Sequence, residues 1–129
     1  MNLPLPARRR LLLSLLAATA VPAWAAPAKP RVEVWKSPYC GCCKDWIAHL
    51  ENEGFAVQAH EVGDLDGARR KLGMPERYAS CHTARVGNYL LEGHVPAADI
   101  RRLLADKPPA IGLAVPGMPV GSPGMDGPA

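Results

Sequence analysis

The sequence predicts a single α/β domain that ends in an irregular arm. Residues 31–36 alternate apolar and charged side chains, as in a half-buried strand. Trp46, Ile47 and Leu50 then recur at helical spacing, and residues 55–62 show a second strand pattern. A strand, a helix and a strand in that order indicate a parallel βαβ unit.

The first 25 residues have the layout of a signal peptide. Residues 8–10 are arginines, residues 11–20 are apolar, and Ala23 and Ala25 are the small residues of a cleavage site. The apolar run is shorter than the roughly 20 residues that cross a bilayer. We therefore expect export to the periplasm by the Sec or the twin-arginine route, with no stable membrane insertion after cleavage.

Charge argues against a nucleic-acid or lipid partner. The chain has 15 Lys and Arg against 12 Asp and Glu, and three of the arginines lie in the predicted signal. The remaining residues 26–129 are thus close to neutral and large enough for one small domain. The basic clusters at residues 69–71 and 101–102 are interpreted as solvated helix faces.

The rest of the chain continues the α/β pattern. Residues 65–72 predict a short helix, and residues 83–86 and 89–92 predict a hairpin around a Gly-Asn turn. Residues 96–107 predict a further helix that begins at a proline and ends before two prolines. From residue 110 to 129 glycine and proline leave no usable period, which predicts an irregular arm over the surface.

The cysteines give this layout a chemical meaning. A βαβ unit followed by a hairpin and a helix is typical of thioredoxin-like domains, and Cys40 and Cys43 have the Cys-x-x-Cys spacing and position of their redox pair. Cys42 is a surplus thiol, and we expect Cys81, just before the hairpin, to pack against the same turn. Four sulfur atoms would then converge. Structural disulfides remain an alternative in an exported chain, but three thiols in four residues suit a soft cation better.

Neighbouring side chains help to choose among soft cations. Met118 and Met125 lie in the arm, and thioether ligands favour Cu(I) over zinc. His82 and His94 are borderline ligands that could also accept Cu(II). For each there is a simpler interpretation: the methionines could anchor the arm as apolar side chains, His82 could be solvated, and His94 could hydrogen-bond within its turn.

Three motifs make a resemblance specific. The segments SPYCGCCKDW, GMPERYASCHTARVGNYLLEGHVPAADIRRLL and GLAVPGMPVGSPGMDG resemble the CopG-type family of exported copper-resistance proteins over nearly all of residues 31–127. The resemblance implies a thioredoxin-like fold with copper in a thiolate cluster, and in some members interconversion of Cu(I) and Cu(II). It implies four ligands, which are Cys40, Cys42, Cys43 and Cys81. Four further residues match motif positions and are our inferred ligands: His82, His94, Met118 and Met125. Members usually continue into another strand after the last motif, so we expect a less firmly anchored arm or a sheet without that edge.

Three hypotheses of different class follow. The leading one is a periplasmic copper-binding protein of copper resistance or homeostasis, whose partners are copper ions and other periplasmic copper-handling proteins. It leaves open whether the protein is an enzyme, which would be a copper oxidoreductase. The second is a thiol-disulfide oxidoreductase that uses Cys40 and Cys43. The third is a zinc-binding carrier module.

Overall fold

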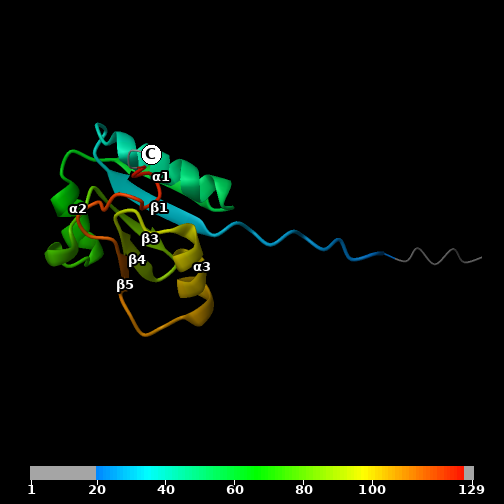
Figure 1. Ribbon diagram of the computed structural model, residues 1–129. Coiled ribbons are helices and arrows are strands. Elements are labelled where there is room, and N and C mark those ends of the chain that lie inside the picture. The colour runs from blue at the N-terminus through cyan, green and yellow to red at the C-terminus, as the bar shows by residue number, and fades with distance from the viewer. Residues whose placement is uncertain (1–19, 127–129) are drawn as a thin grey trace, which may run out of the picture.

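The computed structural model describes residues 20–126 of the 129-residue chain. These residues form one mixed sheet with helices on both faces, and residues 20–30 run away from it without regular structure (Figure 1). Most of the predicted signal peptide, residues 1–19, lies outside the described residues. Within residues 20–126, no helix combines the length and the apolar character needed to span a membrane.

The sheet has five strands in the order β2-β1-β3-β4-β5. Strand β1 is parallel to β2 and antiparallel to β3, which in turn forms a hairpin with β4, and β4 is parallel to β5. The strands are β1 (Arg31–Lys36), β2 (Ala56–Glu61), β3 (His82–Val86), β4 (Tyr89–Glu92) and β5 (Gly112–Ala114). The helices are α1 (Gly41–Asn52), α2 (Leu65–Leu72) and α3 (Ala97–Asp106), with one 3₁₀ turn, η1 (Glu76–Tyr78).

Local sequence accounts for where the helices stop and start. The Asp64 side chain caps α2 by accepting a hydrogen bond from the Gly67 N–H at 2.8 Å. Gly73 ends the same helix with φ of 88°, a left-handed conformation that costs glycine little. Pro96 directly precedes α3, where the absence of a backbone N–H costs no helical hydrogen bond.

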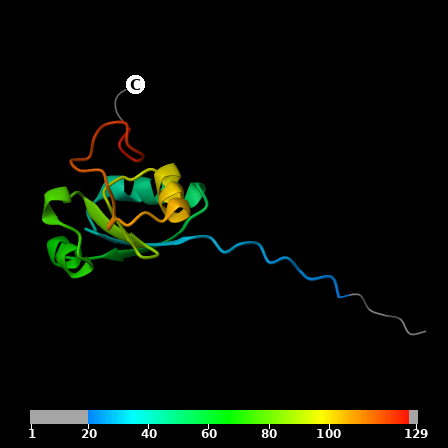
Figure 2. The same ribbon diagram turned by 90° about the horizontal axis from the view of Figure 1, so that it is seen from below.

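Helices α1 and α3 cover one face of the sheet and α2 covers the other (Figure 2). The core lies between β1 and the first pair of helices, where Val32, Val34, Trp46, Leu50 and Ile100 are fully buried. Alternate residues of β1 face this core because side chains of a strand point to opposite faces. The indole N–H of Trp46 donates to the Val95 carbonyl at 2.9 Å, which ties α1 to the segment before α3.

The predicted α/β class and the element order are confirmed. The thioredoxin-like assignment stays a prediction. The prediction of irregular chain from residue 110 is wrong for Gly112–Ala114, which pair with β4 as β5. A side chain at Gly112 would collide with the Leu90 carbonyl, so glycine permits the close approach, and Leu113 packs on the core. Three residues between prolines are too few to show a period.

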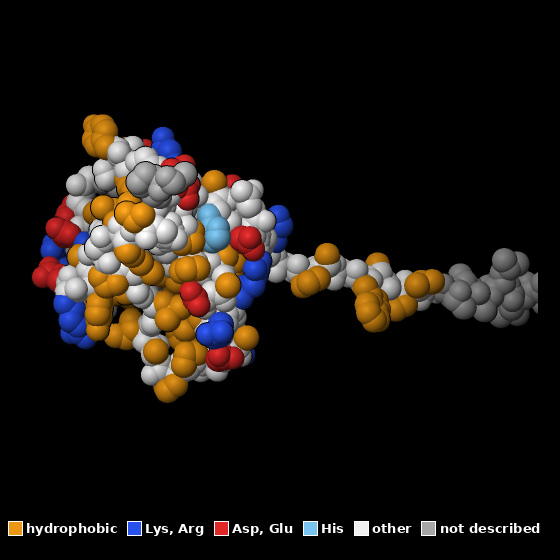
Figure 3. Space-filling model, in the orientation of Figure 1, with side chains coloured by type: hydrophobic (Ala, Val, Ile, Leu, Met, Phe, Trp, Pro, Cys, Tyr) orange, Lys and Arg blue, Asp and Glu red, His pale blue; other side chains and the backbone are white. Residues whose placement is uncertain are grey.

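One residue of a basic cluster departs from the solvated helix face that the sequence suggests: Arg70 and Lys71 are exposed, but Arg69 is buried. Arg69 is only 2% exposed, and its guanidinium lies 2.8 Å from the carboxylate of Glu92, which is fully buried in β4. Asp66 also accepts from Arg69 at 2.7 Å. The Arg69 side chain is therefore buried next to Glu92, because a buried carboxylate requires a paired cation. Elsewhere, on the face shown in Figure 3, basic and acidic side chains are interspersed.

The buried pair yields a stability prediction. Replacement of Arg69 by Met should lower the free energy of unfolding by about 3–5 kcal/mol, because it leaves the Glu92 carboxylate buried without its partner. The neighbouring Arg70, 58% exposed and 3.7 Å from Glu76, is the matched control, and Arg70→Met should cost less than about 1 kcal/mol. Urea unfolding measures both values. If both variants lost the same free energy of unfolding, the buried pair would not stabilise the protein more than the exposed one.

Candidate metal centre

Three of the four cysteines gather at the amino end of α1. Cys40 precedes the helix, while Cys42 and Cys43 lie in its first turn. Cys40 and Cys43 form a disulfide, and the Cys40 Sγ lies 3.5 Å from the Cys42 Sγ. The unsatisfied N–H groups and the positive dipole end of a helix favour anions such as thiolates at this position.

Cys81 completes the group from a distant part of the chain. It lies immediately before β3, and the Cys43 Sγ is 3.6 Å from its carbonyl oxygen. The Sγ atoms of the four cysteines all lie within 4.8 Å of one another. Cys42 and Cys81 are the free thiols among the described residues. The structure thus brings together the four sulfurs that the spacing predicts to converge.

A buried polar network positions the segment that carries Cys81. The Arg69 guanidinium donates to the Ser80 carbonyl at 2.9 Å, and the Ser80 N–H donates to the Glu92 carboxylate at 2.7 Å. Helix α2 and strand β4 therefore fix the backbone on both sides of Ser80, the residue before Cys81. Sequence reasoning missed this network, because nothing in the local pattern distinguishes Arg69 from its exposed neighbour.

Two buried histidines approach Cys81 from the core side. The His82 Nδ1 lies 3.3 Å and the His94 Nε2 lies 3.2 Å from the Cys81 Sγ. Both side chains are fully buried, and the ring of His82 packs on Trp46 with centroids 4.2 Å apart. Cys81, His82 and His94 form a second group that could hold a metal ion, and it shares Cys81 with the four-cysteine group.

The C-terminal arm reaches the centre through its backbone. The Pro123 carbonyl lies 2.6 Å from the His94 Nδ1, and Gly124 lies against the first turn of α1. The expectation of a less firmly anchored arm stays a prediction, and the arm supplies the acceptor that a buried imidazole N–H needs. Met118 is 40% exposed with φ of 48°, and Met125 is half-buried. Their roles as ligands stay predictions.

The protein environment favours neutral side chains around Cys81. Burial, and then the nearby Cys42, raises the pKa of the Cys81 thiol to about 11. Burial, and then the nearby His94, lowers the pKa of His82 to about 3. Near pH 7 the centre therefore offers a protonated thiol and an uncharged imidazole. A bound cation would favour the thiolate of Cys81 over the thiol, because thiolates rather than thiols bind metals.

Alkylation can test the protonation state of Cys81. In metal-free protein, the rate at which iodoacetamide modifies Cys81 should rise about tenfold per pH unit from pH 7 to about pH 10, because the pKa lies near 11 and only the thiolate reacts. Mass spectrometry of the digested protein separates Cys81 from the other cysteines. N-acetylcysteine is the control, and its rate should level off at lower pH than that of Cys81, about one unit above an ordinary thiol pKa. A plateau for Cys81 below pH 9 would contradict the prediction.

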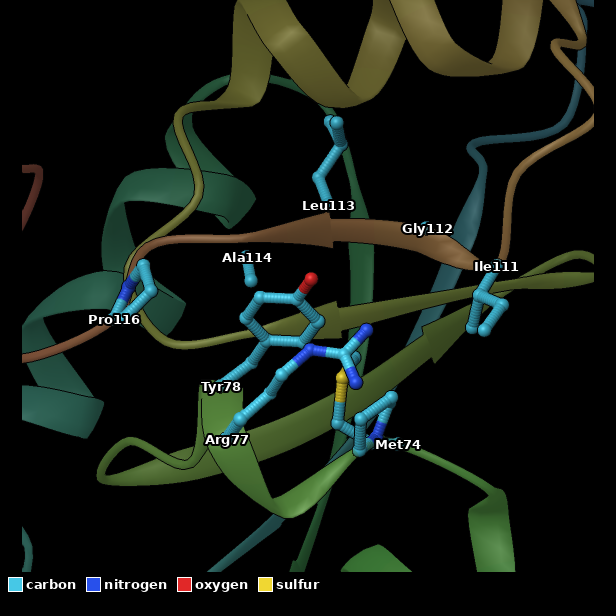
Figure 4. Close-up of a pocket in the computed structure, with 9 residues that line it drawn as sticks. Met74, Arg77, Tyr78, Ile111, Gly112, Leu113, Ala114 and Pro116 are labelled. Atoms are coloured by element: carbon cyan, nitrogen blue, oxygen red, sulfur yellow. The ribbon is translucent and has the colours of Figure 1, made fainter.

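One apolar pocket lies away from the sulfur group and has none of its donor side chains. A pocket of about 380 Å³ lies between β5 and η1, and its walls are mostly apolar (Figure 4). The Arg77 guanidinium lies over the ring of Tyr78 there, 4.6 Å from its centroid. The residues lining it include no cysteine or histidine. The sulfur group and the two buried histidines therefore lie outside this pocket.

Comparison with known proteins bears directly on this site. The family described as "Protein of unknown function, DUF411" matches residues 78–125, which include Cys81, both buried histidines and the arm. Two solved structures also match, each titled "Copper resistance protein copG". Form 2 has 47% identity and a TM-score of 0.73, and the alignment covers 77% of this chain and 79% of that one. Form 1 has 48% identity and a TM-score of 0.71, with 76% and 78% covered.

The chain belongs to the CopG family of copper resistance proteins. The identity and the coverage of both CopG structures carry this assignment, which confirms the resemblance of the three motifs. A comparison with curated proteins finds no match. The CopG relationship and the sulfur group together indicate a protein with a site that could hold a metal ion.

Sequence reasoning located the candidate donors of this CopG-family chain better than the residues that position them. The cysteine spacing signals the sulfur group, and His82 is next to a predicted ligand. The contact of Pro123 and Gly124 with the centre was missed. One sequence signal for this contact was the segment SPGMDG. Its first glycine follows a proline but does not end any predicted helix or strand.

Proposed function

We propose that the protein is a periplasmic copper-binding protein of copper resistance, and that it holds copper in a centre built around Cys81. The observation that carries the proposal is the meeting of four sulfur atoms from two distant segments, with two buried imidazoles against one of them. Cys40, Cys42, Cys43 and Cys81 are the proposed thiolate ligands. His82 and His94 are the proposed nitrogen ligands.

The chemistry of the donors supports copper over zinc. A tetrahedral group of four thiolates suits zinc as well as copper, so the sulfurs alone do not decide. The adjoining pair of imidazoles adds a second set of donors, which zinc in a closed four-sulfur site would not need. The titles of the two related structures name copper resistance. Met118 and Met125 are proposed as thioether donors, which would favour Cu(I).

Loading of the full sulfur group requires reduction of the Cys40–Cys43 disulfide. A dithiol reductant would supply two electrons and two protons, leave as a disulfide and give two cysteine thiols. Each thiol would lose its proton when it binds metal. The redox state of this pair would therefore decide how many sulfurs the centre offers to copper.

The two donor groups share Cys81, and this has a consequence for the oxidation state of copper. Thiolates stabilise Cu(I), whereas imidazoles also accept Cu(II). A copper ion near Cys81 could exchange sulfur for nitrogen donors without leaving the protein. We propose on this basis that the centre serves both copper states, with a periplasmic copper-handling protein as donor or acceptor of the ion.

The location is part of the proposal. The signal-peptide pattern of residues 1–25 supports export. A disulfide beside two free thiols fits an oxidising compartment such as the periplasm, where disulfides form and persist.

Cysteine variants test the copper proposal. Reduced, oxygen-free protein should bind Cu(I) in at least equimolar amount, and Cys42→Ser should weaken binding by at least tenfold because a hard hydroxyl replaces a soft thiolate. Cys81→Ser should lose more copper per chain than Cys42→Ser, since Cys81 belongs to both donor groups. Competition with a chromophoric Cu(I) chelator and elemental analysis measure the two quantities. Ser37→Ala is the neighbouring control. Undiminished binding by both cysteine variants, or selective retention of zinc, would refute the proposal.

A second function is favoured by one observation, the Cys40–Cys43 disulfide at the amino end of α1. This is the arrangement of a thiol-disulfide oxidoreductase, in which the helix dipole stabilises the attacking thiolate. If that is the function, metal-free protein should reduce a disulfide substrate catalytically with a dithiol as electron source, and Cys40→Ser should abolish turnover while Cys42→Ser leaves it intact. Insulin reduction followed by turbidity measures this. No turnover above the uncatalysed dithiol reaction would exclude the second function.

A further inference from the structure

We propose that Pro123 and Gly124 are positioning residues of the metal centre, which set the tautomer of His94 and so aim its Nε2 atom at Cys81. The inference rests on the proposed function for the identity of the metal. The positioning itself concerns contacts within the protein. Figures 1 and 2 both show the C-terminal segment, drawn in red, beside the start of α1, where the cysteines lie.

The hydrogen bond to Pro123 determines which ring nitrogen carries the proton. The His94 Nδ1 lies 2.6 Å from the Pro123 carbonyl oxygen. A carbonyl oxygen can only accept, so Nδ1 must be the donor and the proton sits on that atom. In the neutral ring the Nε2 is then unprotonated, and its lone pair faces the Cys81 Sγ at 3.2 Å. This is the tautomer that can bind a metal through Nε2.

Gly124 permits the arm to come this close. A Cβ atom at position 124 would lie 2.7 Å from the Trp46 backbone N, 3.1 Å from the Cys42 carbonyl oxygen and 3.1 Å from the His94 Nδ1. Two of these three atoms belong to the backbone of α1, which cannot move aside as a flexible side chain would. Any side chain at this position should therefore lift the arm and break the bond between Pro123 and His94.

The arm is shaped so that the Pro123 carbonyl faces the histidine. Its turn is closed by a hydrogen bond from the Met125 N–H to the Ser122 carbonyl at 2.8 Å and by one from the Gly121 N–H to the Met125 carbonyl at 2.9 Å. These bonds stay within the arm. The Pro123 carbonyl and Gly124 both contact the rest of the protein at this turn, so the seating of the arm and the orientation of His94 are coupled.

A matched pair of glycine variants can separate positioning from backbone strain. Gly124 has φ of 82° and Gly117 has φ of 74°, so alanine is strained in a similar way at both positions. A Cβ at Gly117 would meet nothing within 4 Å. In metal-free protein, long-range ¹H–¹⁵N NMR should show His94 protonated at Nδ1 in the wild type and in Gly117→Ala, and a mixture of tautomers in Gly124→Ala. Nε2 protonation in the wild type, or the same spectrum in both variants, would overturn the proposal.

Copper binding by the same proteins supplies the functional readout. Gly124→Ala should weaken Cu(I) binding by about 10–100-fold, the usual effect of losing a partner that orients a metal-binding histidine, while Gly117→Ala should stay within about twofold of the wild type. Equal weakening in the two variants would overturn the proposal. If the wild type binds no copper, the proposed function fails, whereas the tautomer measurement still decides whether the arm sets His94.

Discussion

The antiparallel pairing of β1 with β3 is the constraint on which the candidate metal centre depends. Lys36, the last residue of β1, pairs with His82, the first residue of β3. The chain that leaves β1 toward Cys40 and the chain that enters β3 from Cys81 therefore lie at the same end of the sheet. Helix α1 starts at that end, so its first turn adds Cys42 and Cys43 to the sulfur group. A shift of this register by one residue would turn His82 to the other face.

Burial gives the centre its chemical character. The side chains of His82 and His94 lie in the hydrophobic core beside Trp46, where a charged imidazole would lose its solvation. The His82 Nε2 has no hydrogen-bond partner among the described residues. The protein thus carries polar atoms that its own structure satisfies only in part, which is common where a site serves a ligand rather than stability. The Arg69–Glu92 pair plays a different part: one oxygen of the buried Glu92 carboxylate pairs with the guanidinium and holds the backbone beside Cys81.

In the arm, the position of an irregular segment depends on close contacts of particular residues, as the position of a helix does. Its glycines at positions 117, 121 and 124 all have positive φ, but they differ in their surroundings. Open space surrounds the first two, whereas the backbone of α1 and the ring of His94 crowd the third. Composition describes all three as turn residues. Only the packing distinguishes a glycine that allows a turn from one that allows a contact.

Sequence by itself determined the α/β class, the order of the elements and the positions of the candidate donors by type and spacing. These features are local: periods of two and 3.6 residues, turn residues, and three thiols in four positions. The tertiary structure alone decided that β5 joins the sheet, that Arg69 is buried, and that Pro123 reaches His94. Each of these depends on contacts between segments far apart in the chain, and their energies come from desolvation and close approach, which no local pattern encodes.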